Sequence, residues 1–101
     1  CPIRYLKWDM NRSLANVYSA ALPAARQGEV YHRYVLGVYE LQRRLTEAYP
    51  DLLLENCAGG GARLDCGMLY FSPQIWCSDN TDARARMSIQ SGTGLFYRKQ
   101  A

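Results

Sequence analysis

The sequence of 101 residues has no long hydrophobic run, a single histidine and only four cysteines. No apolar stretch approaches the roughly 20 residues that a membrane-spanning helix requires, so no membrane association is expected. None of the cysteines belongs to a Cys-x-x-Cys pair and His32 is distant in sequence, which argues against a zinc site. So few cysteines predict reduced thiols, and the first residues lack the segments of a signal peptide. Together these features favour a cytoplasmic protein.

The charged residues show no concentration of one sign. Twelve basic and nine acidic residues give a net charge of +3, and the basic ones are dispersed along the chain. A nucleic-acid interface would need a concentrated basic stripe with interleaved aromatics, so we expect solvated helix faces instead. Hydrophobic residues make up 49 % of the chain, which is typical of a globular interior. Because it starts without Met and stops without a terminal element, we expect a fragment of a longer protein.

Hydrophobic patterning predicts strands that alternate with helices. A helix is expected over 30–49, where Val35, Val38, Leu41 and Leu45 recur close to a 3.6-residue period. Short apolar runs predict strands over 3–8, 51–57 and 73–77, and further helices are expected over 63–71 and 81–90. Thr81 is the expected N-cap of the last helix, which Gly92 and Gly94 would end. This order predicts an α/β fold with a parallel sheet of about three βα units.

Each predicted strand is followed by a cluster of polar residues, namely 7–11, 56–63 and 78–82. The carboxyl ends of parallel strands lie at one edge of a sheet or barrel, where functional sites are built. We therefore expect the three clusters to meet in one site.

Two aspartates in these clusters are candidate catalytic acids. Asp9 follows an apolar strand and lies near Lys7, whose charge would keep the carboxylate ionised and able to act as a nucleophile. An Asx turn at the strand end is the structural alternative. Asp79 follows an apolar segment that could partly enclose it and keep it protonated, as an acid catalyst requires. Asp82 is the rival, but the first turn of a helix explains a carboxylate there.

The glycine run from Gly59 to Gly61 allows two interpretations. It lacks the Gly-Lys-Ser/Thr ending of a phosphate-binding loop. Close approach of the backbone to a ligand is one interpretation, and a tight strand-to-helix turn is the other. Trp8 and Trp76 could each offer an apolar face to a sugar ring or belong to the core. Cys57 could be a thiol nucleophile, although His32 has no visible orienting partner.

Three motifs resemble those of bacterial-type α-galactosidases of glycoside hydrolase family 36. They are Lys-Trp-Asp-Met-Asn at 7–11, Cys-Ala-Gly-Gly-Gly-Ala-Arg-Leu-Asp at 57–65 and Ser-Asp-Asn-Thr-Asp-Ala at 78–83. The segment 32–46 also resembles the family's helix between the first two motifs. The resemblance implies that residues 1–101 are part of a catalytic (β/α)₈ TIM-barrel domain, corresponding to strands four to six.

The same resemblance implies a role for each matching residue. Asp9 would be the nucleophile and Asp79 the general acid/base of a retaining double displacement on terminal α-galactosides such as melibiose and raffinose. Lys7 would hydrogen-bond galactose hydroxyls, and the sugar pocket would be lined by Cys57, Gly59 and Gly60. No cofactor or metal is implied, and the parent enzyme is expected to be a homo-oligomer.

This chain departs from the family pattern at Ala58, Ala62 and Cys66, where Ser, Gly and Pro are common. The first two changes could alter substrate fit without touching the acids. Galactosyl transfer of the raffinose-synthase kind uses the same acids and stays open, as does a non-catalytic carbohydrate-binding remnant. With only three barrel strands, the isolated chain is expected to be inactive and poorly stable.

Overall fold

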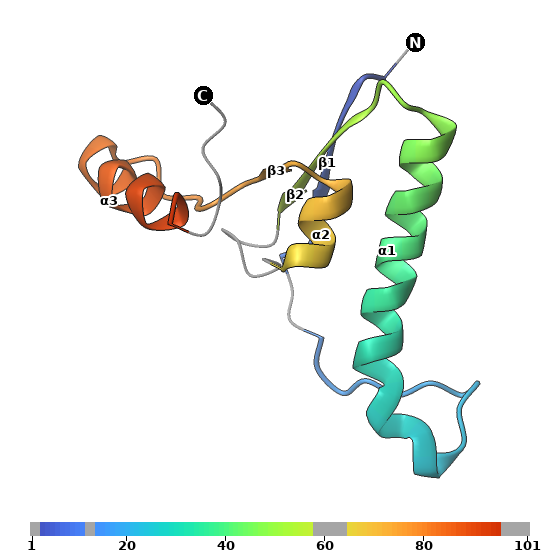
Figure 1. Ribbon diagram of the computed structural model, residues 1–101. Coiled ribbons are helices and arrows are strands. Elements are labelled where there is room, and N and C mark those ends of the chain that lie inside the picture. The colour runs from blue at the N-terminus through green and yellow to red at the C-terminus, as the bar shows by residue number, and fades with distance from the viewer. Residues whose placement is uncertain (1–2, 12–13, 58–64, 96–101) are drawn as a thin grey trace.

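The computed structural model describes residues 3–11, 14–57 and 65–95, and all structural statements concern these ranges. In chain order the elements are β1 (Tyr5–Asp9), the 3₁₀ helix η1 (Ala24–Glu29), α1 (Val30–Ala48), β2 (Leu53–Cys57), α2 (Cys66–Phe71), β3 (Gln74–Ile75) and α3 (Ala83–Thr93). In Figure 1, α1 (green) lies on one side of the strands and α3 (orange to red) on the other. Strands and helices alternate, as the sequence predicts.

The three strands form a parallel sheet in the order β1-β2-β3, with β2 in the centre. Tyr5 pairs with Leu53 and Asp9 with Cys57, so β1 and β2 end together at the carboxyl edge of the sheet. The predicted strand over 73–77 shortens to two residues, although the amide of Trp76 still donates to the Asn56 carbonyl (2.9 Å). This arrangement confirms the predicted parallel α/β fold.

Helix α1 packs on the sheet through a stripe that includes a polar residue. Val38 and Gln42 are buried, whereas Leu41 is 51 % exposed. In an α-helix, the residue four positions after Val38 points about 40° away from it. The residue three positions after Val38 points about 60° away in the opposite sense. Gln42 therefore continues the buried stripe, and Leu41 lies beside it. The helix ends at Ala48, and Pro50 follows where continuation is unfavourable.

Aspartates begin both of the shorter helices. The side chain of Asp65 accepts a hydrogen bond from the Met68 amide (2.8 Å) at the start of α2. Asp82, not Thr81, is the N-cap of α3, because its carboxylate accepts from the Ala85 amide (2.9 Å). The prediction of Thr81 was wrong by one position. Helix α3 also continues through position 92 to Thr93, so only the second of the two predicted glycine stops lies at its end.

The apolar core of the described residues is small. It consists of Val38, Leu54, Cys57 and Met68, contributed by α1, β2 and α2. Large apolar side chains outside it remain exposed, Tyr70 and Leu95 by more than four-fifths. The core thus fixes the central strand β2 against α1 and α2.

Candidate active site

The two faces of the sheet have different surroundings. Gln42 of α1 donates to the Asn56 side chain (2.8 Å), which places Asn56 and its register partner Trp8 on the face that the helices cover. Successive side chains of a strand point to opposite faces. Lys7 and Asp9 therefore lie on the other face, which we call the open face. Trp8 belongs to the helix-covered side and is not available there as a sugar platform.

Asp9 ends β1 at the carboxyl edge of the open face, with an exposed carboxylate. Its Oδ2 accepts a hydrogen bond from the Asn11 amide group (3.0 Å). The pKa of Asp9 is lowered from 3.8, first by a hydrogen bond from the Cys57 thiol, then by Asn11 and least by the charge of Lys7, while some desolvation opposes them. The lowered pKa favours the ionised carboxylate, and the charge of Lys7, which the sequence suggests as the cause, contributes least to it. Hydrogen bonds are the main cause.

Lys7 instead belongs to a charged cluster further along the open face. Its Nζ lies 4.0 Å from Oε1 of Glu55, whose side chain is only 5 % exposed. Gln74 of β3 donates to the other oxygen of Glu55 (3.1 Å). Lys7 also lies over the ring of Trp76, 4.7 Å from its centroid. These contacts tie the open-face side chains of all three strands together.

Asp79 follows β3 and is exposed, so the predicted enclosure by the preceding apolar residues is not seen in this structure. It is nevertheless held in place, because the indole Nε1 of Trp76 donates to its Oδ1 (2.6 Å). Because β3 ends at Ile75, the strand does not extend far enough to enclose the Asp79 side chain. The Lys7–Trp76–Asp79 contacts link the Asp9 strand to Asp79 through one shared set of side chains.

The rival aspartate has a different task. Asp82 caps α3 through the Ala85 amide, and its own backbone amide donates to the Asn80 side chain (2.9 Å). These bonds account for Asp82 as a helix-start residue, as its position in the sequence predicts. They favour Asp79 as the residue for chemistry.

The predicted pocket residues Gly59 and Gly60 lie outside the described residues. Cys57, also predicted to line the pocket, is 2 % exposed and lies directly beside Asp9 in the register. Among the described residues no group of three or more His, Cys, Asp or Glu side chains could hold a metal ion. No helix in the described part of the chain is both long and apolar enough to cross a bilayer.

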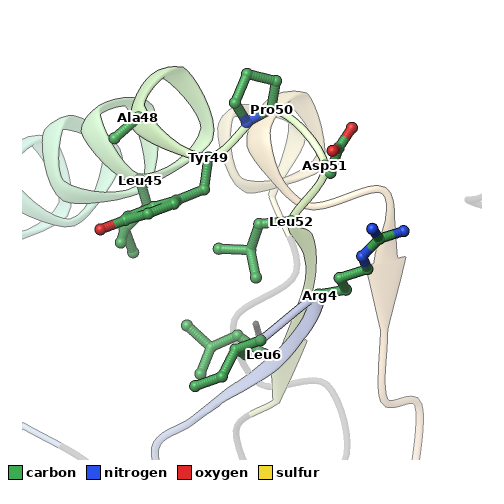
Figure 2. Close-up of a pocket in the computed structure, with 9 residues that line it drawn as sticks. Arg4, Leu6, Leu45, Ala48, Tyr49, Pro50, Asp51 and Leu52 are labelled. Atoms are coloured by element: carbon green, nitrogen blue, oxygen red, sulfur yellow. The ribbon is translucent and has the colours of Figure 1, made fainter. Parts of the chain in front are cut away.

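A cavity of about 650 Å³ lies at the other end of the sheet. Figure 2 shows it between the end of α1, with Leu45 and Tyr49, and the strand starts, with Leu6 and Leu52. Its lining is mostly apolar, and Arg4 and Leu52 directly precede β1 and β2, at the end of the sheet opposite to Asp9. This cavity is therefore separate from the site around Asp9.

Comparison with known proteins decides the family. The sequence model of the family described as Melibiase matches residues 1–101. The chain belongs to the melibiase family. The resemblance that the three motifs carry is thereby confirmed.

Relatives within the melibiase family are close. Alpha-galactosidase 1 of Pediococcus pentosaceus is 67 % identical over 95 residues, which is 94 % of this chain and 13 % of that protein. Alpha-galactosidase Mel36A of Lactobacillus acidophilus is 60 % identical over the same shares. The crystal structure of the GH36 alpha-galactosidase AgaA from Geobacillus stearothermophilus matches with a TM-score of 0.90 at 54 % identity, covering 95 % of this chain and 13 % of that one. The chain thus spans about an eighth of the length of these relatives.

The buried carboxylate of the open face, Glu55, is not apparent from the sequence. Glu55 lies in an apolar strand and was not singled out, yet it ion-pairs with Lys7. The strand pattern does place it, because Leu53, Glu55 and Cys57 occupy every second position of the strand and therefore share one face.

Proposed function

We propose that this chain supplies the two catalytic carboxylates of a retaining α-galactosidase, with Asp9 as nucleophile and Asp79 as general acid/base. The observation that carries the proposal is the placement of the acids. Asp9 ends β1 and Asp79 follows β3, and these strands are the two neighbours of the central strand in one parallel sheet. In (β/α)₈ barrels the reacting groups come from the ends of several different strands at the carboxyl edge.

The environment of Asp9 supports the nucleophilic role. A carboxylate attacks an anomeric carbon only when it is ionised and held in place. The lowered pKa of Asp9 keeps it ionised at neutral pH, and hydrogen bonds from Cys57 and Asn11 hold it. The carboxylate is exposed on the open face, where a sugar could reach it.

Solved relatives support the pairing of the two acids. In AgaA, one variant with an aspartate changed to asparagine is a complex with raffinose, and another with an aspartate changed to alanine is a complex with stachyose. The two substituted aspartates of AgaA are as many positions apart as Asp9 and Asp79 are here. This spacing supports Asp79 over Asp82 as the partner of Asp9.

The proposed reaction has two steps. Asp79 gives its proton to the glycosidic oxygen while Asp9 attacks the anomeric carbon, so that the bond to the leaving group breaks and a galactosyl ester forms. Asp79 then takes a proton from water, which attacks the same carbon and releases Asp9. Retaining enzymes hold the two carboxyl groups about 5–5.5 Å apart. Two inversions at one carbon retain the configuration.

The proposed substrates are terminal α-galactosides such as melibiose and raffinose. The raffinose and stachyose complexes of AgaA support this class. We place residues 1–101 within a catalytic (β/α)₈ domain, as strands four to six. The three parallel strands and the helices that connect them support this placement. Lys7 lies on the open face where it could reach sugar hydroxyls.

Azide rescue tests the two roles in the full-length protein. Asp9→Gly should lower turnover of an activated aryl α-galactoside by about 10⁴-fold or more, as expected for loss of a catalytic group. Added azide should restore turnover and give the β-galactosyl azide, because azide enters through the space that the carboxylate leaves. Asp79→Gly with azide should give the α-galactosyl azide, because azide then attacks the ester on Asp9. Failure of azide to rescue Asp9→Gly would contradict the nucleophile assignment.

Asp82→Asn is the matched control for Asp79. Asparagine is also a good N-cap, so this variant keeps the start of α3 while removing a carboxylate. We expect turnover within about threefold of the wild type. A loss as large as that of Asp79→Gly would transfer the acid role to Asp82.

A further inference from the structure

We propose that Trp76 is a positioning residue for Asp79, holding the acid/base by its indole N–H instead of stacking on a sugar. The inference rests on the proposed function of Asp79. Nε1 of Trp76 donates to Oδ1 of Asp79 at 2.6 Å, a short distance for a hydrogen bond from nitrogen to a carboxylate. Among described residues no other side-chain hydrogen bond to Asp79 is seen.

Trp76 is itself held by three contacts. Its backbone amide donates to the Asn56 carbonyl of the central strand (2.9 Å). Lys7 lies 4.7 Å from the ring centroid, and the guanidinium carbon of Arg86 lies 5.1 Å from it. Both distances are within the range of cation–π attraction.

The two cations are anchored in turn. Glu55, buried in the sheet, ion-pairs with Lys7, and Arg86 of α3 donates to the Ser78 carbonyl (2.9 Å). With cations already over its ring, Trp76 is poorly suited to stack on a sugar. Its polar edge, which points to Asp79, is the part left for function.

The chemistry of general acid catalysis explains what the N–H does. Because Oδ1 of Asp79 accepts from Trp76, the transferable proton is directed to Oδ2. When that proton leaves for the glycosidic oxygen, Asp79 becomes a carboxylate, and a hydrogen bond to an ionised acceptor is stronger than one to a neutral acid. The bond therefore strengthens as the reaction proceeds, which is the condition for lowering a barrier.

Trp76→Phe in the full-length protein tests this role, since it keeps an aromatic ring and removes the N–H. Acid assistance matters most for poor leaving groups. We expect kcat/KM to fall about 10- to 100-fold for raffinose, part of the roughly 10²–10⁴ that general acid catalysis contributes. For a dinitrophenyl α-galactoside, which leaves without a proton, the fall should be below about threefold. Equal losses for both substrates, or a loss confined to KM, would overturn the proposal.

Trp8→Phe is the matched control, because it makes the same change on the helix-covered face. We expect it to leave the ratio between the two substrates unchanged. If Trp76→Phe fails to fold, benzothienylalanine at the same position replaces the N–H by sulfur in a ring of the same shape, and the same two substrates apply.

Combining the change with Asp79→Ala separates the two proposals. A residue that acts through Asp79 has no further effect on the raffinose rate once Asp79 is absent, so the double variant should match Asp79→Ala. A further loss in the double variant would assign Trp76 to the sugar. If Asp79→Ala itself affects both substrates equally, the acid/base assignment fails. If only Trp76→Phe does so, the acid/base assignment stands and the positioning role fails.

Discussion

Residues 1–101, produced alone, should not form a stably folded protein. The chain has a surface of 7698 Å² and a radius of gyration of 16.0 Å. A compact monomer of 11.5 kDa is expected to expose about 5,800 Å² and to have a radius of gyration of about 13 Å. The chain therefore exposes about 1,900 Å² more than a self-contained domain of its mass.

The size of this excess decides the outcome. If 55–60 % of it is apolar, as is usual for protein surfaces, about 1,100 Å² of apolar area lacks a covering partner. At about 25 cal/mol per Å², that burial corresponds to about 28 kcal/mol, which exceeds the 5–15 kcal/mol by which whole domains are stable. Exposed Ile3, Tyr70 and Leu95 are part of this uncovered area.

Circular dichroism with urea titration would measure this directly. We expect partial helix signal, no cooperative transition and no galactoside turnover from the isolated chain. The full-length protein, assayed in parallel, is the control. A cooperative transition with an unfolding free energy above about 5 kcal/mol for residues 1–101 alone would refute the reasoning.

Three further outcomes are expected in the full-length protein. Gly67→Ala should lower the free energy of unfolding by about 1–3 kcal/mol in urea titrations, because its Cβ would lie 2.8 Å from Cε2 of the Tyr39 ring; an unchanged midpoint would contradict the packing. Cys57→Ala should move the acidic limb of the kcat/KM–pH profile to higher pH, because the thiol is the main cause of the lowered pKa of Asp9. Cys57→Ser keeps a donor and should move it less; equal shifts would contradict the thiol's role. Asp82→Ala should cost about 1 kcal/mol of stability through loss of the α3 cap, and no loss relative to Asp82→Asn would show that the cap is dispensable.

The sequence predicts the order of elements well because that order depends on local patterns. Apolar runs bounded by Pro50 and the glycine run define β2, and the 3.6-residue period defines α1. Helix starts are less certain, because adjacent Thr81 and Asp82 are both good caps and only the backbone geometry selects one. The burial of Gln42 in place of Leu41 follows from the direction of the sheet, which periodicity alone leaves open.

The sequence singles out Asp9 and Asp79 as candidate acids but not the side chains that contact them. Asp9 and Asp79 stand out because each follows a predicted strand. Glu55 and Trp76 act through register and cross-strand contacts, which require knowledge of which strands are neighbours. The same holds for Cys57, whose hydrogen bond to Asp9 depends on their being register partners.

Covalent trapping is the most direct measurement of the central claim. The full-length protein would be incubated with 5-fluoro-α-galactosyl fluoride, digested with a protease, and the labelled peptide sequenced by mass spectrometry. A galactosyl-type label on the carboxylate of Asp9, absent in Asp9→Asn and still formed in Asp79→Asn, is the predicted result. A label on any other residue would contradict the assignment of the nucleophile.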